Sequence, residues 1–165
     1  MIRAGTVVLL LLLACGCSAD NGSEPPAEYS SEAPRDLRVE RISSGAPGQG
    51  PDQPRVIVAS SATALSGATG ADVPDSGKGT YLAVYWGERP TGGYSLDVGS
   101  ARLEGDRVTV GLALEEPPRG AVVTQALTYP YAVAVVRDLD PRGMEFSFTD
   151  QSGRELGWPV RLVGG

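Results

Sequence analysis

Residues 80–87, TYLAVYWG, decide the fold class of this 165-residue chain. The stretch is apolar throughout and rich in aromatic and β-branched side chains, which is typical of a strand covered on both faces. Shorter segments before and after it, 37–42, 94–98 and 144–148, alternate apolar and polar residues as half-buried strands do. We therefore expect residues 80–87 to form a central strand, with half-buried strands around it.

The rest of the chain also favours short strands over helices. The chain contains 22 Gly and 13 Pro residues, and this composition favours turns. A helical turn or two is expected only within residues 60–70, after a capping serine. The sequence predicts an all-β fold with at most one short helix, an antiparallel sandwich or open barrel of seven to nine short strands. The further segments expected as strands are 55–59, 101–103, 107–114 and 131–136, followed by a C-terminal hairpin at 144–162.

The first 14 residues have the pattern of a signal peptide. Arg3 supplies the positive charge, and residues 7–13 form an apolar run too short to span a bilayer. The run ends in Leu-Leu-Ala-Cys15, which resembles the bacterial lipobox, where cleavage precedes a cysteine that is then diacylated. Cys17 is the alternative acceptor, although it lacks leucine at the matching position. We expect an exported protein, lipid-anchored to the outer face of the bacterial membrane; an ordinary secretory signal is the alternative.

Residues 15–36 should form a disordered tether, and residues 37–163 the folded β domain. The segment 18–34 contains one aromatic residue and no aliphatic side chain larger than alanine, so it cannot bury enough apolar area to offset its chain entropy. Such a tether would hold the domain away from the lipid surface.

The composition argues against several kinds of chemistry. The chain has no histidine, and its two cysteines both lie in the N-terminal region, so the domain offers no Ser-His-Asp triad and no Cys or His ligands for zinc. The net charge of −6 argues against a nucleic-acid surface. We expect no metal, no cofactor and no enzymatic activity. Asp138-Leu139-Asp140 resembles part of a calcium loop, but Pro141 and Arg142 follow where further oxygen ligands would be needed.

The least ordinary stretch is GERPTGGYSL at residues 87–96. Pro90 presets its own φ angle, while Gly92 and Gly93 permit positive φ. Arg89 and Tyr94 are residue types that often anchor interfaces. The stretch is either a tight connection with Tyr94 as a packing lid, or a binding loop.

This turn and a later Tyr-Pro-Tyr resemble the C-terminal domain of the PrcB protease-complex subunit family, over residues 82–137. The resemblance implies a small β-rich domain of exported bacterial proteins, whose namesake is a non-catalytic lipoprotein subunit that supports a surface protease. The hairpin at 144–162 lies beyond the family's usual end. The residues that form the candidate binding loop are Arg89, Pro90, Thr91, Gly92, Gly93, Tyr94, Tyr129, Pro130 and Tyr131.

Besides a non-catalytic lipoprotein that binds or stabilises an exported protein, two other functions remain open. The turn Thr91–Tyr94 is also similar to the Thr-Gly-Tyr/Phe turn of chagasin-like inhibitors of cysteine peptidases, which implies a peptidase inhibitor. A cell-envelope module that binds a ligand such as a cell-wall glycan would use aromatic side chains for stacking. The candidates for stacking are Tyr81, Tyr85, Trp86, Tyr94, Tyr129, Tyr131 and Trp158.

Overall fold

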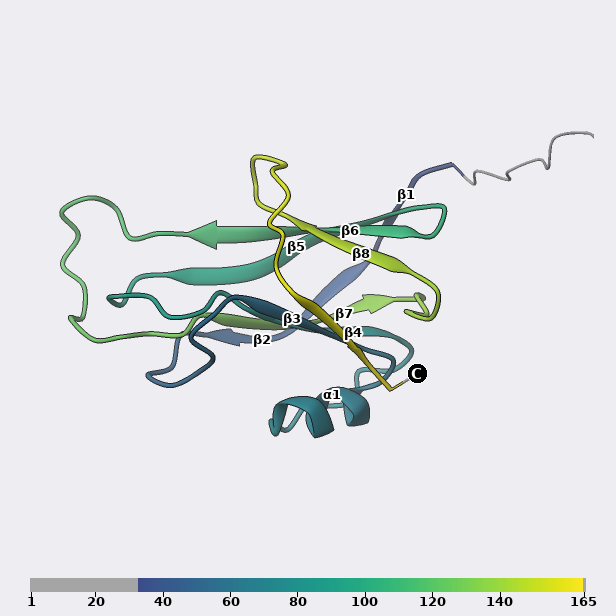
Figure 1. The fold of residues 1–165 in the computed structure, drawn as a ribbon, viewed down its shortest axis with the longest axis horizontal. Coiled ribbons are helices and arrows are strands. Elements are labelled where there is room, and N and C mark those ends of the chain that lie inside the picture. The colour runs from purple at the N-terminus through teal and green to yellow at the C-terminus, as the bar shows by residue number, and fades with distance from the viewer. Residues whose placement is uncertain (1–32, 165) are drawn as a thin grey trace, which may run out of the picture.

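The computed structural model describes residues 33–164, which form two β-sheets packed face to face (Figure 1). The signal peptide, Cys15, Cys17 and most of the proposed tether lie outside the described residues. The first sheet has the order β1-β5-β6-β8, with β1 at Arg35–Leu37, β5 at Ser95–Glu104, β6 at Arg107–Glu115 and β8 at Glu145–Thr149. The second sheet has the order β2-β7-β4-β3-β9, with β2 at Val39–Gly45, β7 at Tyr131–Arg137, β4 at Gly79–Tyr85, β3 at Arg55–Ala59 and β9 at Val160–Val163.

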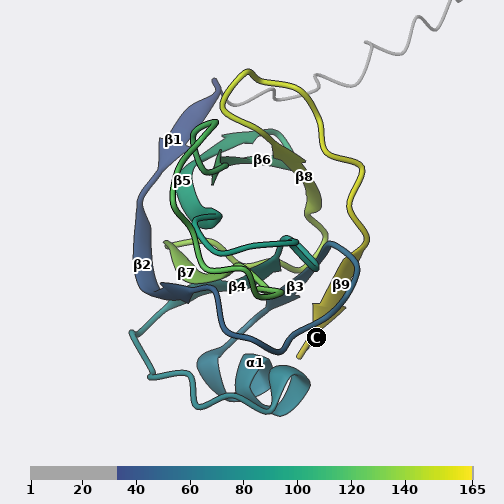
Figure 2. The same ribbon diagram turned by 90° about the vertical axis from the view of Figure 1, so that its left-hand side faces the viewer.

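One short helix, α1 at Ala62–Thr69, covers the outer face of the second sheet (Figure 2). The Ser61 side chain caps it by accepting from the Ala64 N–H at 3.1 Å, and Gly70 ends it in the left-handed conformation. The β-rich fold with a single short helix is therefore confirmed, and the architecture is a sandwich.

Strand β4 is buried on both faces, as its sequence predicts. Leu82 and Val84 point into the core between the two sheets. Tyr81 and Ala83 point to the other side, into a second apolar cluster under α1. A strand covered by a sheet on one face and a helix on the other has no face exposed to solvent, which explains the unbroken apolar run.

The expected C-terminal hairpin at 144–162 is wrong. The turn after β8 does form, because Thr149 bridges to Glu155 and the Leu156 N–H donates to the Phe148 carbonyl at 2.8 Å. The chain then crosses to the second sheet, where β9 pairs with β3, while β8 pairs with β6 in the first sheet. Both pairs are parallel, so the sheets are mixed and not purely antiparallel.

The single strand expected at 37–42 is also wrong, because the chain changes sheets at Arg38. Leu37 pairs with β5 in the first sheet, whereas Val39 pairs with β7 in the second. The Arg38 carbonyl accepts from the Arg137 N–H at 2.8 Å. Strand β1 begins at Arg35, so the last two residues assigned to the tether belong to the first sheet.

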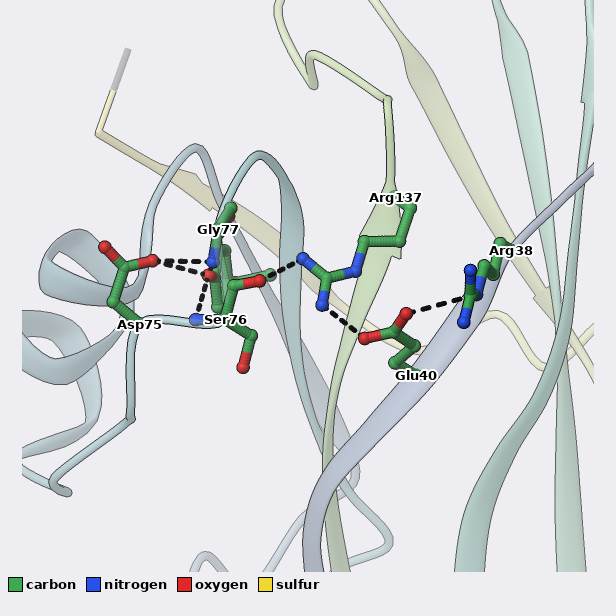
Figure 3. Close-up of polar contacts among 7 residues, drawn as sticks. Arg38, Glu40, Asp75, Ser76, Gly77 and Arg137 are labelled. Atoms are coloured by element: carbon green, nitrogen blue, oxygen red, sulfur yellow. Dashed lines mark hydrogen bonds and ion pairs between the residues drawn. The ribbon is translucent and has the colours of Figure 1, made fainter.

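A polar network holds the loop before β4 against the end of β7 (Figure 3). The Arg137 guanidinium donates to the Ser76 carbonyl and to the Glu40 carboxylate, which also pairs with Arg38 at 3.1 Å. The Asp75 carboxylate accepts from the Gly77 N–H at 2.8 Å and lies 3.1 Å from the Tyr81 hydroxyl. Tyr81 is 1% exposed and belongs to the second apolar cluster, under α1. The contact between its hydroxyl and Asp75 therefore holds this loop against that cluster.

This network should make the loop sensitive to acid. The hydrogen bond from Arg137 lowers the pKa of Glu40, and the hydrogen bond from the Gly77 N–H lowers the pKa of Asp75. A carboxyl group whose pKa is lowered by folding stabilises the folded state above its unfolded pKa, and this stabilisation is lost as the pH falls through the folded pKa. We therefore expect the urea concentration at the midpoint of unfolding to decrease as the pH falls below about 4. Midpoints of Asp75→Asn should depend less on pH than those of the wild type, and equal pH profiles would contradict this role.

Candidate functional site

The turn at residues 87–94 lies at one end of the sandwich, where β4 and β6 end and β5 and β7 begin (Figure 1, left). The long connection from β6 to β7, residues 116–130, lies at the same end. This is the end that faces the viewer in Figure 2.

Backbone hydrogen bonds fasten the turn to residues 124–128. Arg89 and Thr128 exchange both backbone hydrogen bonds, at 2.7 and 3.0 Å. The Gly92 N–H donates to the Thr124 carbonyl at 2.9 Å, and the Thr128 hydroxyl donates to the Thr91 carbonyl at 2.7 Å. The turn is thus paired with the 124–128 segment, which holds its backbone in place.

Arg89 and Tyr94 both pack on Trp86. The Arg89 guanidinium lies 4.8 Å from the centre of the Trp86 ring and donates to the Trp86 carbonyl at 2.7 Å. Tyr94 meets the same ring edge-on, with centroids 5.6 Å apart. These contacts match the packing-lid interpretation, and both side chains remain half-buried. Among residues 33–164, Arg89 Nε is the buried side-chain polar atom that has no hydrogen-bond partner.

The two glycines of the turn differ in their role. Gly93 has φ +87°, and a Cβ atom there would lie 2.9 Å from Pro117 Cβ and 3.0 Å from Val123 Cγ1. Gly92 does not have a positive φ, and a Cβ atom there would meet Thr124 only at an ordinary contact distance of 3.4 Å. Only Gly93 therefore requires glycine for its backbone conformation.

The later residues of the predicted site separate. The Tyr129 hydroxyl donates to Glu88 at 2.7 Å, and this bond raises the pKa of Tyr129. The carbonyl of buried Pro130 accepts from the Trp86 N–H at 2.9 Å. Tyr129 and Pro130 therefore lie at the same end of the sandwich as the turn. Tyr131, in contrast, packs against the outer cluster beside α1, whereas Tyr94 packs against the core between the sheets. The structure does not bring Tyr131 together with the turn.

Two exposed aliphatic residues lie outside the candidate loop that the sequence predicts. Val122 is 104% exposed and Leu127 is 49% exposed, and both lie in the connection that holds the turn. The available signal was the presence of aliphatic side chains in a segment with no strand or helix pattern. We use the name turn face for the surface formed by residues 87–94 and 121–129.

A cleft of about 540 Å³ separates the turn from residues 150–158. Arg89, Trp86 and Trp158 line it together with the turn after β8. The polar groups of that turn are already engaged, because Asp150 accepts from the Ser152 hydroxyl and the Gln151 amide bonds both backbone groups of Leu114. The bond from Ser152 lowers the pKa of Asp150.

The aromatic residues suggested for glycan stacking are not equally available. Tyr81 and Trp86 are 1% and 6% exposed, so neither offers a ring face to a ligand. The other five candidates are half-buried.

No group of three or more His, Cys, Asp or Glu side chains suited to a metal ion occurs within residues 33–164. At the possible calcium loop, Arg142 binds Asp140 through both carboxylate oxygens and lowers its pKa to about 2. In the same part of the chain, no helix is long and apolar enough to cross a membrane.

One of the comparisons with known proteins, a match to a family model, agrees with the resemblance drawn from the turn. No curated protein and no solved structure matches the chain. The family model described as PrcB C-terminal matches residues 80–137, from the start of β4 to the end of β7. This segment contains the whole turn face and also Trp86, on whose ring Arg89 and Tyr94 pack. The resemblance to the PrcB family is therefore confirmed: residues 80–137 of this chain match the PrcB C-terminal domain.

Proposed function

We propose that this protein is a non-catalytic lipoprotein, exported and anchored through a lipid on Cys15, that binds or stabilises an exported protein. Cys17 is the alternative acceptor. The bound protein is an exported protease or another envelope protein, and this chain acts as a subunit of the protease complex, in keeping with the family that residues 80–137 match. The domain would act by presenting the turn face to this partner outside the membrane.

The observation that carries this proposal is the position of the exposed aliphatic side chains. Val122 and Leu127 belong to the connection whose residues 124–128 are hydrogen-bonded to the turn. Leu127 lies within this hydrogen-bonded segment, and an exposed apolar side chain on a fixed backbone loses little conformational freedom when a partner buries it. Exposed apolar side chains on one connection can form part of a protein interaction surface.

Leu162 supplies a matched control for the test. It is 55% exposed, close to the value for Leu127, but it lies in β9 and pairs with Val58, toward the end of β3 that is away from the turn face. A substitution there changes the same kind of exposed side chain without touching the turn face.

The test is site-specific photo-crosslinking of the full-length protein in membranes of its source cell. A photoreactive phenylalanine analogue at position 122 or 127 should crosslink one exported protein, identified by mass spectrometry as a protease or a subunit of its complex. The analogue at position 162 should not. Val122→Asp with Leu127→Asp should lower capture of that protein about tenfold or more, since burying an unpaired carboxylate is costly, while Leu162→Asp should leave capture unchanged. Equal crosslinking at all three positions would refute the proposal, and inhibition of added papain or subtilisin would favour a peptidase inhibitor.

A further inference from the structure

A small pocket lies on the outer face of the second sheet, between the end of α1 and strand β2. It has a volume of about 260 Å³, and we call it the tyrosine pocket because Tyr85 and Tyr131 form part of its lining. These two residues are direct cross-strand neighbours on β4 and β7. The lining also includes Ile42, Ser43, Asp72, Val73 and Val133.

The backbone of β2 makes room for the ring of Tyr131. Gly45 is paired with Tyr131, and a Cβ atom at this glycine would lie 3.3 Å from the Tyr131 ring and 3.7 Å from its hydroxyl. The Tyr131 side chain therefore reaches across β2. Burial raises the pKa of Tyr85.

The only charged side chain in the lining is Asp72, which is exposed. The ion pairs within residues 33–164 use other carboxylates: Asp36, Glu40, Asp97, Glu104, Asp140, Glu145 and Asp150. The pocket thus combines aliphatic walls, two phenol rings and one carboxylate outside the ion pairs, in a protein of net charge −6. This combination complements a cation on an aliphatic stem.

The ring of Tyr85 already attracts a cation. The Arg55 guanidinium lies 5.3 Å from its centroid. Arg55 is on β3, on the side of β4 away from Tyr131, where it lines a separate pocket with Ile57 and Arg161. A second cation would be repelled by Arg55, so the favourable position for it is the part of the tyrosine pocket on the other side of Tyr85, where Tyr131 lies.

We propose that the tyrosine pocket binds the ammonium end of an alkylamine. The methylene groups would pack on Ile42, Val73 and Val133, while the ammonium would meet the Asp72 carboxylate and the π face of Tyr131. The amine would come from a lysine side chain of a partner protein or from a free diamine. This inference does not depend on the turn face or its partner.

The test is a titration of the full-length ¹⁵N-labelled protein in detergent micelles, followed by NMR. The probes are Nα-acetyl-lysine N-methylamide, which represents a protein lysine, and 1,5-diaminopentane, which represents a free amine. The matched control is Nα-acetyl-norleucine N-methylamide, which keeps an aliphatic stem and lacks the ammonium. At least one amine should shift the amide signals of Ser43, Asp72 and Val73 in a saturable way, and the one that binds more tightly identifies the source.

Substitutions then separate the charge from the rings. Asp72→Asn should weaken amine binding about fivefold or more, because it removes the charge-assisted contact, and Asp106→Asn, at an exposed turn in the first sheet, should not. Tyr131→Phe should keep binding and Tyr131→Leu should lose it, with unchanged spectra elsewhere showing that both variants are folded. Equal binding of the norleucine control, or no saturable shift with either amine, would overturn the proposal while leaving the turn face untouched.

Discussion

Replacing Gly79 with alanine should destabilise the domain by about 3 kcal/mol or more, since a strained backbone and an overpacked core each cost about 1–3 kcal/mol. Gly79 begins β4 with φ +154°, and a Cβ atom there would clash with the Val136 carbonyl oxygen and lie 2.9 Å from Val135 Cγ2. Both obstacles belong to the neighbouring strand β7, whose residues at these positions are fully buried. The clash can be relieved only by moving the central pair of strands apart.

The measurement is urea unfolding of the wild type and of two alanine variants. Gly67→Ala is the matched control, because Gly67 lies in α1 with nothing within 4 Å of an added Cβ atom. It should stabilise the protein by about 0.5–1 kcal/mol, since alanine favours a helix interior more than glycine. If both variants had the stability of the wild type, the close approach of β4 and β7 at Gly79 would be wrong.

The burial of β4 could be predicted because its sequence has no polar face. An unbroken apolar run means that both sides of a strand are covered, and Leu82 on one face and Tyr81 on the other show that this is so. The helix at Ala62–Thr69 could be predicted for a similar local reason, namely the capping Ser61. Such signals lie within the element itself and do not depend on what it contacts.

Strand pairing could not be predicted in the same way. Leu156, Trp158 and Val160 alternate and pack on the core between the sheets. That pattern is the same whether the segment pairs with β8, as expected, or crosses to β3, as it does. The change of sheets at Arg38 is hidden for the same reason, since Leu37 and Val39 both pack on this core although they pair with different sheets. Alternation shows which side chains are buried and not which strand is the neighbour.

The candidate site was predicted in part. Glycine, proline and aromatic residues marked the turn at 87–94, because their conformational and packing properties act locally. Its attachment to residues 124–128 is made mainly by backbone groups, such as the paired Arg89 and Thr128, and these leave no mark in the sequence. The position of Tyr131 next to Pro130 suggests that it belongs to the turn, but strand alternation places its side chain on the outer face of the second sheet.

The Trp86 ring connects the fold to the turn face, so its removal should affect both. Trp86 is 6% exposed, and its ring contacts both Arg89 and Tyr94. Trp86→Ala should lower the free energy of unfolding by about 3–5 kcal/mol, as is typical for loss of a buried large aromatic side chain. It should also leave Arg89 and Tyr94 without their support, so the turn should lose its fixed shape even in the molecules that remain folded.

Two measurements on Trp86→Ala separate these effects. The chain has two tryptophans, so Trp158 alone reports urea unfolding in this variant. Hydrogen exchange of the Arg89 and Thr128 amides, which bond each other's carbonyls, reports the turn. We expect these amides to exchange faster than the global stability of the variant requires, whereas Trp86→Phe, which keeps a ring under Arg89, should restore much of their protection. Trp86→Ala with wild-type protection at both amides would show that the 124–128 segment holds the turn without the tryptophan, and the turn face would then be an independent surface element.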